Sequence, residues 1–260
     1  MESNINELPS GLQQAQGAKA TIRLGKVVIN NMPVLPYAVD EAMNRLSLNL
    51  GFVGKEIKRI MVISSVPDEG KSFISMMLWK KLSESGQNSV LVDCDLRKSV
   101  MVSKYQIIRS DNRTIGGLSN YLSGNCGIED TLFHTNIRHG SIVPNQKNAP
   151  RPALLLQNDR MEKLLTFLAA KYDRVIVDVP PLGPVSDGEI IGSLCDGFLL
   201  VVRAGMTNKR LVRNSLVRME RSGCTFLGFV LSRAGTSRGS YYGGLYGKYG
   251  GYNYSSYEYE

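Results

Sequence analysis

The chain has 260 residues, which suits one α/β domain and leaves no room for two full ones. Hydrophobic residues make up 43%, an ordinary share for a globular core, and no apolar run approaches the roughly 18 residues needed to cross a bilayer. The segment from Met1 to Gly17 is polar and has no signal-peptide core, so we expect a cytosolic protein. The net charge of +8 favours an acidic partner without identifying it.

The cysteine pattern agrees with a reducing compartment. Four cysteines are present, far apart and without a C-x-x-C pair: Cys94, Cys126, Cys195 and Cys224. The two histidines, His134 and His139, do not complete a usual zinc site with them at these spacings. We therefore predict buried or reduced thiols.

The first residues show neither helical nor strand periodicity and contain several prolines and glycines. We interpret residues 1–36 as an extended N-terminal arm that docks on a partner. Between residues 37 and 52, apolar side chains recur every four residues, which predicts a helix. This helix opens the main domain, which we place at residues 37–234.

Strands and helices then alternate along the chain. Continuous apolar runs predict strands, and periodic runs predict helices; the strands are expected at 59–64, 89–93, 174–178, 197–202 and 226–231, and the helices at 70–85, 159–171 and 207–222. Gly86 stands where a left-handed helix stop is expected. Continuous rather than alternating apolar runs indicate strands that are covered on both faces. The pattern predicts an α/β fold with a doubly wound, mostly parallel sheet.

The end of the chain changes character. Within residues 235–260 glycines separate the aromatic residues, and Leu245 is the only aliphatic side chain. This segment holds eight of the twelve tyrosines: Tyr241, Tyr242, Tyr246, Tyr249, Tyr252, Tyr254, Tyr257 and Tyr259. Such a segment cannot bury enough apolar surface to offset the entropy lost on ordering, so we predict a disordered C-terminal tail.

The loop after the first predicted strand fits a phosphate-binding P-loop, although Gly-Lys-Ser alone also occurs in surface turns. Gly70 lets the backbone approach the phosphates, Lys71 reaches the β- and γ-phosphates, and Ser72 binds Mg²⁺. The predicted ATP-binding residues are Ser65, Val66, Pro67, Asp68, Glu69, Gly70, Lys71, Ser72 and Phe73.

Carboxylates follow two more predicted strands. Asp93 and Asp95 end the second strand and share one strand face if the strand continues; a turn capped by Asp95 is the alternative. Asp178 ends a later strand, where a carboxylate usually makes the second contact to the P-loop magnesium; a capped strand end before a Pro-Pro turn is its alternative. Because the carboxyl ends of parallel strands meet at one edge, the three motifs together predict one Mg·ATP site and a P-loop NTPase architecture.

These motifs resemble those of a known family. Residues 37–260 are similar to the cytoplasmic domain of bacterial tyrosine kinases that act with polysaccharide co-polymerases. The resemblance rests on five features: the P-loop residues Pro67 and Glu69, the D-x-D-x-R run from Asp93 to Arg97, the D-x-P-P run at Asp178, the segment Gly117-Leu118-Ser119, and the tyrosine cluster. The tyrosine cluster separates these kinases from other P-loop ATPases.

The resemblance implies a role for each site residue. Lys71 holds the phosphates, and Ser72 and Asp178 position Mg²⁺. Asp93 accepts the proton of an attacking tyrosine and Asp95 lies nearer the metal, although these two roles can be exchanged. The implied catalytic set is Asp93, Asp95 and Lys71, and the implied metal set is Ser72, Asp95 and Asp178.

The resemblance also implies partners and a cellular role. The tail tyrosines are expected to be phosphorylated between subunits of a homo-oligomer. A membrane-embedded adaptor of the co-polymerase type is expected to activate the chain at the inner face of the plasma membrane, and a protein-tyrosine phosphatase to reverse the modification. The implied role is control of capsule or exopolysaccharide synthesis and export.

The chain departs from the family pattern at several positions. The ring-forming helix of the family reads E-x-x-R-x-x-R, whereas here Glu41 is followed by Asn44 and Ser47. Ser232 stands where an Asn that reads the base often ends the last strand, and Asp68 replaces a P-loop glycine. These differences leave the ring contact and the ATP affinity open.

Two other functions share part of this evidence. A ParA/MinD-like ATPase of positioning or partition has the same three motifs, but it places a second lysine near the start of the P-loop, where this chain has none. A non-catalytic adaptor would carry a tail that another kinase phosphorylates; the presence of every catalytic residue type argues against it.

The helix expected at 207–222 is strongly basic. We interpret its cations as a solvated face over an apolar stripe of Leu211, Leu216 and Met219, and we predict no nucleic-acid partner. The cations are Lys209, Arg210, Arg213, Arg218 and Arg221.

Overall fold

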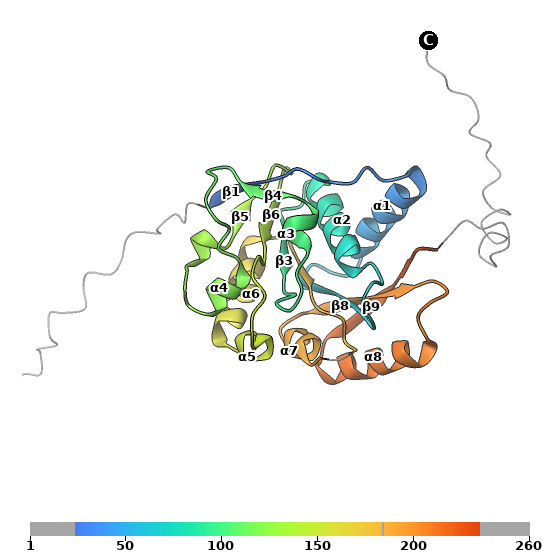
Figure 1. The fold of residues 1–260 in the computed structure, drawn as a ribbon. Helices are drawn as coiled ribbons and strands as arrows, with labels where there is room; N and C mark the ends of the chain where they lie inside the picture. Colours follow the sequence, from blue (N-terminus) through green and yellow to red (C-terminus); the bar gives the residue numbers. More distant parts are fainter. Residues whose placement is uncertain (1–23, 184, 235–260) are drawn as a thin grey trace, which may run out of the picture.

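The structure is a computed structural model that describes residues 24–183 and 185–234. These residues form one sheet with the strand order β4-β1-β5-β6-β3-β7-β2-β8-β9, and helices lie on both of its faces (Figure 1). The β1–β4 and β5–β6 pairs are antiparallel, and the other neighbouring strands are parallel. The predicted α/β fold with a mostly parallel sheet is confirmed.

The elements have the following bounds. The strands are β1 Gly25–Ile29, β2 Arg59–Ser64, β3 Ser89–Asp93, β4 Ile107–Arg109, β5 Phe133–His134, β6 Gly140–Val143, β7 Arg174–Asp178, β8 Gly197–Arg203 and β9 Thr225–Ser232. The helices are α1 Tyr37–Gly51, α2 Lys71–Glu84, α3 Met101–Lys104, α4 Leu118–Leu122, the 3-10 turn η1 Ile128–Asp130, α5 Pro152–Leu156, α6 Asp159–Lys171, α7 Asp187–Gly192 and α8 Lys209–Arg221.

The two faces of the sheet carry separate apolar cores. Helices α1, α2 and α3 cover one face, where Trp79 is fully buried, and α4 to α8 cover the other, where Met161 is fully buried. Successive residues of β2 alternate between them: Ile60 packs into the first core and Met61 into the second. This double coverage explains why the central strands read as continuous apolar runs.

Several elements have the bounds that the sequence predicted. The strands β2, β3 and β7 and the helix α6 agree with the prediction residue for residue. Helix α2 ends at Glu84, and Gly86 has a φ of 91°, the left-handed conformation expected of a helix stop. All four cysteines are free, and three of them are buried.

Strand β1 was not predicted, and it corrects the interpretation of residues 1–36. Residues 25–29 pair with β4 on one side and with β5 on the other, so this part of the expected arm belongs to the sheet. The side chain of Asn136 completes the edge, accepting from the backbone N–H of Ile29 at 2.9 Å and donating to its carbonyl at 3.2 Å. The rest of the expected arm, up to residue 23, lies outside the described residues.

Helix α8 also differs from the prediction. Leu211, expected in its apolar stripe, is 42% exposed, whereas Leu216 and Met219 pack against the core as predicted. Val212 takes the place expected for Leu211. The helix begins after Asn208, whose side chain accepts from the backbone N–H of Arg210 at 2.8 Å. This N-cap satisfies one of the backbone N–H groups that the start of the helix leaves without a partner.

Candidate active site

The predicted phosphate-binding loop joins β2 to α2. Gly70 has a φ of 90° and stands directly before the first residue of α2, so the left-handed turn there is one that glycine adopts without strain. Pro67 and Asp68 form the exposed tip of the loop, and Asp68 has a φ of 64°. Val66 and Phe73 are half-buried at the two ends. The backbone therefore has the shape that a phosphate cradle requires.

Neighbouring elements hold this loop in place. Ser65 is buried, and its hydroxyl accepts a hydrogen bond from Ser215 on α8 at 2.9 Å. Ser232, at the end of β9, donates to the carbonyl of Glu69 at 2.5 Å. A Cβ added at Gly70 would meet Ser232 at 3.7 Å, so β9 lies against the turn. Ser232, which the family resemblance connected with base reading, contacts the loop itself.

Glu69 is the internal brace of the loop. Its side chain is buried, and one carboxylate oxygen accepts from the backbone N–H of Val66 at 2.9 Å. The other oxygen accepts from the hydroxyl of Thr207 and, at 3.4 Å, from the backbone N–H of Arg203. The carboxylate therefore ties the loop to the segment between β8 and α8. Thr207 was missed from the sequence, because nothing local connects it to the P-loop.

Lys71 lies at the base of the loop and is buried. Its ammonium donates to Asp178 at 2.8 Å and to the hydroxyl of Ser72 at 3.0 Å. The hydroxyl of Ser75 lies 2.8 Å from the same carboxylate oxygen of Asp178. Three predicted site residues from two elements thus meet in one cluster. Ser75 was not predicted, although its position four residues after Lys71 on a helix places both on one face.

Asp93 lies beside this cluster at the end of β3. It stands opposite Asp178 in the register of β3 and β7, and the backbone N–H of Cys94 donates to the Asp178 carbonyl at 2.8 Å. Asp93 is 1% exposed; burial, followed by the neighbouring charge of Asp178, raises its pKa to about 7. A hydrogen bond from the hydroxyl of Ser99 opposes this rise. Asp93 can therefore gain and lose a proton near neutral pH.

Asp95 has a different environment. Strand β3 ends at Asp93 and does not continue to Asp95, so the condition under which the two side chains would share a strand face is not met. One carboxylate oxygen of Asp95 accepts from the backbone N–H groups of Arg97 and Lys98, at 3.2 and 2.9 Å, and this closes a turn. The contacts of Asp95 therefore agree with the alternative interpretation, a turn that the Asp95 side chain caps. Its predicted approach to a metal stays a prediction.

The segment Gly117-Leu118-Ser119 borders the same edge of the sheet. The backbone N–H of Leu118 donates to the carbonyl of Pro144 at 2.8 Å, and that of Ser119 donates to the side-chain oxygen of Asn145 at 3.2 Å. The amide nitrogen of Asn145 in turn donates to the carbonyl of Asp95 at 3.3 Å. Asn145 is buried and was not predicted; it links this segment to the turn after β3.

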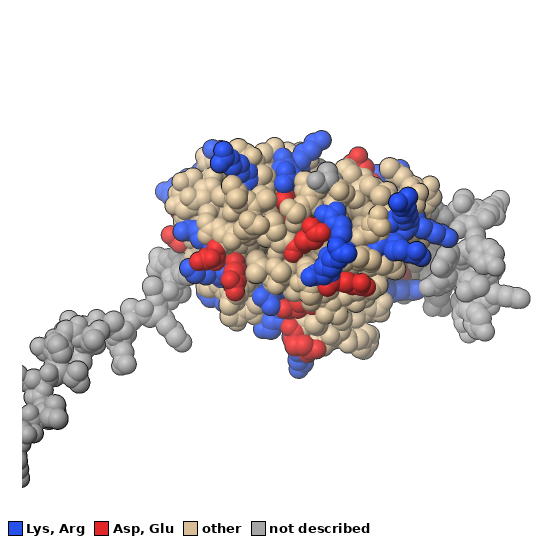
Figure 2. Space-filling view, turned by 90° about the horizontal axis from the view of Figure 1, so that it is seen from below, with Lys and Arg blue, Asp and Glu red and all other residues tan. Residues whose placement is uncertain are grey.

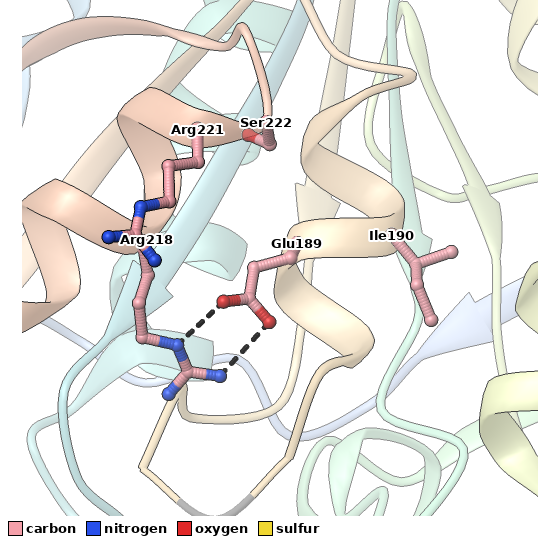
Figure 3. A pocket seen from close by; sticks show the side chains of 5 residues that line it. All are labelled: Glu189, Ile190, Arg218, Arg221 and Ser222. Carbon is pink, nitrogen blue, oxygen red and sulfur yellow. Dashed lines mark hydrogen bonds and ion pairs between the residues drawn. The ribbon is translucent and has the colours of Figure 1, made fainter.

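Two arginines fix the chain after Asp178. The guanidinium of Arg97 donates twice to the buried carboxylate of Asp187, at 2.7 and 2.9 Å. In the hollow between α7 and α8, Arg218 pairs with both oxygens of Glu189, at 2.7 and 3.1 Å (Figure 3). Arg218 also donates to the carbonyl of Val185 at 2.9 Å. It is therefore an anchor of this segment, which corrects its assignment to a solvated face.

The cluster fits a Mg-bound triphosphate in its donor set. The ammonium of Lys71 and the left-handed turn at Gly70 suit phosphate oxygens, and the oxygens of Ser72 and Asp178 are of the kind that Mg²⁺ prefers. Among residues 24–183 and 185–234, no three or more His, Cys, Asp or Glu side chains are arranged to hold a metal. A Mg²⁺ ion here would complete its coordination with phosphate oxygens and water.

Some predictions concern residues beyond this part of the chain. The eight tail tyrosines, from Tyr241 to Tyr259, lie outside the described residues. Within the described part, no helix combines the length and the apolar character of a membrane span.

The strand order and the loop after β2 define the class of the protein, which is that of the P-loop NTPases. The septum site-determining protein MinD of Pyrococcus horikoshii OT3, solved with Mg-ADP, shares the fold with a TM-score of 0.59 at 21% identity, over 70% of this chain and 72% of that chain. No family model matches the sequence.

Tyrosine kinases are more similar to the chain than MinD is. The tyrosine-protein kinase CpsD of Streptococcus agalactiae is 39% identical over 211 residues, which cover 81% of this chain and 90% of that protein. The kinase domain of the Escherichia coli tyrosine kinase ETK has a TM-score of 0.67 at 30% identity and covers 77% of this chain and 79% of that chain. The chain belongs to the family of bacterial tyrosine-protein kinases, as its motifs predicted.

Proposed function

We propose that the chain transfers the γ-phosphoryl group of ATP to tyrosines of its own C-terminal tail. The observation that carries the proposal is the joint burial of Lys71, Asp178 and Asp93 around the start of α2, with an ammonium and two carboxylates at one sheet edge. Family membership supplies the reaction class, and the tail supplies the acceptors.

The residues divide the chemistry among them. Mg·ATP supplies the phosphoryl group and, through the cation, neutralises part of its charge. Lys71 moves its ammonium from Asp178 to the phosphate oxygens, and the backbone N–H groups at Gly70 orient them. Ser72 and Asp178 are then free to hold the cation. This arrangement stabilises the negative charge that develops on the transferred group.

Asp93 is the proposed base. Its pKa of about 7 allows it to take the proton of a tyrosine hydroxyl while the phenol oxygen attacks the γ-phosphorus, the bond from that phosphorus to the β,γ-bridging oxygen breaks, and ADP leaves. Asp95 is held by two backbone N–H groups in its turn, which favours Asp93 over Asp95 for this role.

The proposed setting follows the family. The tail, residues 235–260, would be phosphorylated by a neighbouring subunit of a homo-oligomer, and residues 37–234 together with β1 would form the kinase domain. Activation by a membrane-embedded polysaccharide co-polymerase-type adaptor, reversal by a protein-tyrosine phosphatase, a cytoplasmic location at the inner membrane face and control of capsule or exopolysaccharide synthesis complete the proposal.

A mixing experiment tests the reaction and its direction. One chain carries Lys71→Met and an intact tail; the other has an intact site and phenylalanine at all eight tail tyrosines. With Mg·ATP and the adaptor's cytoplasmic segment, phosphate should appear on the Lys71→Met chain only in the mixture, as read by peptide mass spectrometry. A mixture without tail phosphate would refute transfer between subunits, and an intact chain without tail phosphate would refute the function. Phosphorylation only after addition of another kinase would instead support the non-catalytic adaptor.

A further inference from the structure

Helix α8 has two halves with different charge environments. In the C-terminal half, Arg218 pairs with Glu189, and Arg221 lies beside the same carboxylate in the hollow between α7 and α8 (Figure 3). The ion pair with Arg218 is the main cause of a lowered pKa of Glu189, and the charge of Arg221 adds to it. The positive charge of this half is therefore partly compensated within the fold by Glu189.

The N-terminal half has no such compensation. Lys209, Arg210 and Arg213 are exposed, and none of them makes an ion pair with any residue in the described part of the chain. Arg213 follows the other two by three and four residues, so the three cations share one face of the helix. Figure 2 shows Lys and Arg side chains gathered at one end of the face that includes α8. We call these three residues the α8 basic face.

The position of these cations is unusual for a helix. The first turn of α8 contains no acidic residue, although the positive end of the helix dipole favours acids there and disfavours cations. Folding alone therefore does not explain three cations at this end. An anionic ligand would offset both the repulsion among the three cations and their repulsion by the positive end of the helix dipole.

Strand β9, the last described strand, ends beside the segment that leads into this helix. In the register of β8 and β9, Ser232 stands opposite Arg203, and the backbone N–H of Ala204 donates to the Ser232 carbonyl at 3.0 Å. Arg203 ends β8, and five residues separate it from the start of α8. Tyr241 follows Ser232 by nine residues, which can span about 30 Å. The first two turns of α8 are about 11 Å long, so the first tail tyrosines can reach them.

The charge of the tail depends on phosphorylation. Residues 235–260 contain two basic residues, Arg238 and Lys248, and two acidic ones, Glu258 and Glu260, so the side-chain charges of the unmodified tail sum to zero. Each phosphotyrosine adds about −1.5 to −2 charges and oxygens that arginine binds in pairs. Only the modified tail is therefore complementary to the α8 basic face.

We propose that the α8 basic face is a binding site for phosphotyrosines of the chain's own tail. The inference rests on the proposed function, because that function supplies the phosphates. A tail bound there is held on its own subunit and is withdrawn from the active sites of neighbours. The hydrogen bond from Thr207 to Glu69 connects the residues just before α8 to the P-loop. The α8 basic face is therefore linked to the proposed nucleotide site through a direct side-chain contact.

A peptide-binding experiment tests the site without relying on kinase activity. The probe is a fluorescent peptide of residues 238–250, synthesised with phosphates on Tyr241, Tyr242 and Tyr246 or with none. The partner is the full chain after phosphatase treatment, with excess Mg·ADP to keep the phosphates of the peptide out of the P-loop. Fluorescence anisotropy should show about tenfold or more tighter binding of the phosphopeptide, and the difference should shrink at high salt.

Two variants locate the site. The triple change Lys209→Gln, Arg210→Gln and Arg213→Gln should abolish the preference for the phosphopeptide. Arg221→Gln, at the compensated end of the same helix, is the matched control and should retain it. Because all four side chains are exposed, the melting temperatures of both variants should stay close to that of the unmodified chain.

The outcomes are distinct. Equal affinity for the two peptides, an unchanged preference in the triple variant, or an equal loss in Arg221→Gln overturns the proposal. Capture of the chain by phosphatidylserine vesicles through the same three cations, without a phosphopeptide preference, assigns the face to a membrane and also overturns it. A chain that fails to phosphorylate its tail but binds the phosphopeptide refutes only the proposed function.

Discussion

The centre and one flank of the sheet differ in how they are built and in what they carry. The central strands β3 and β7 are buried at every residue, and the pairs that join β3, β7 and β2 are parallel. Asp93 ends β3, Asp178 ends β7, and the P-loop follows β2. The strands of the flank β4-β1-β5 contain exposed or half-buried residues between buried ones. The β1–β4 pair is antiparallel, and so is the pair that joins β5 to β6. None of the predicted site residues lies there. The comparison indicates that the centre carries the candidate site, whereas the flank completes the sheet.

The sharpest test of the centre is Lys71→Met. We expect phosphoryl transfer to fall by about 1,000-fold or more, because the ammonium that stabilises the transferred charge is lost. Tail phosphorylation with labelled ATP measures this. If the activity of Lys71→Met stayed within tenfold of that of the unmodified chain, the proposed role of Lys71 in phosphoryl transfer would be wrong.

The same substitution leaves Asp178 buried without its cation. We expect the free energy of unfolding of the nucleotide-free protein to fall by about 3 kcal/mol, and the double variant Lys71→Met/Asp178→Asn to recover most of it without recovering activity. Urea unfolding measures both variants. If the double variant were no more stable than Lys71→Met alone, the unpaired charge of Asp178 would not be the cause of the lost stability.

The second prediction concerns Asp93→Asn, which should lower kcat by about 100-fold or more through loss of the base. In the unmodified chain, kcat/KM should rise with pH through about 7 and level off above it, since Asp93 must be ionised. A flat profile between pH 6 and 8 would exclude Asp93 as the base.

Asp93 also predicts how stability depends on pH. The pKa of Asp93 is about 7 in the folded protein and lies above the ordinary value of 3.8. Between pH 3.8 and about pH 7, the folded protein therefore keeps a proton on Asp93 that the unfolded chain has lost. The stabilising effect of that proton is complete below about pH 4 and is lost as the pH rises through 7. Asp93→Asn should therefore stabilise the protein by about 1–3 kcal/mol at pH 8 and much less at pH 4. Urea unfolding at the two pH values measures the difference.

The third prediction tests the flank. Val27→Ala in β1 removes two buried methyl groups and should lower the free energy of unfolding by about 2 kcal/mol, with kcat/KM unchanged within twofold. The matched substitution Val92→Ala in β3, next to Asp93, should cost similar stability and also lower kcat. Equal kinetic effects of the two substitutions would remove the distinction between centre and flank.

The smallest expected effect tests the link between the P-loop and α8. Thr207→Val removes a donor to Glu69 and should raise the KM for ATP about threefold to tenfold, with kcat nearly unchanged. Thr207→Ser keeps the hydroxyl and should restore the KM. If serine and valine behave alike, the hydrogen bond has no role in nucleotide binding.

The difference between centre and flank also explains what could be read from the sequence. β2, β3 and β7 are covered on both faces and are therefore continuous apolar runs with clear ends. β5 has two residues and β4 has three, too few for any periodicity to show, and β1 is partly exposed. Their existence depends on pairing between segments far apart in the chain, such as Ile29 with Ile107.

The candidate site shows the same limit. Lys71, Asp93 and Asp178 could be predicted because each ends a strand or opens a helix. Thr207 and Asn145 act through side-chain contacts with residues 138 and 50 positions away, and no local pattern marks them. Asp95 lies in a turn because β3 ends at Asp93. The apolar run alone does not determine the residue at which the strand ends.

The pairing of Lys71 with Asp178 has a consequence for the order of events at the site. A triphosphate that takes the lysine leaves the buried carboxylate of Asp178 as an anion, with the hydroxyl of Ser75 as its remaining side-chain partner among the described residues. A divalent cation restores neutrality, so anion and cation should each strengthen the binding of the other by the same factor. Nucleotide without a divalent ion should therefore bind poorly, and the empty enzyme keeps its own charges balanced until both arrive.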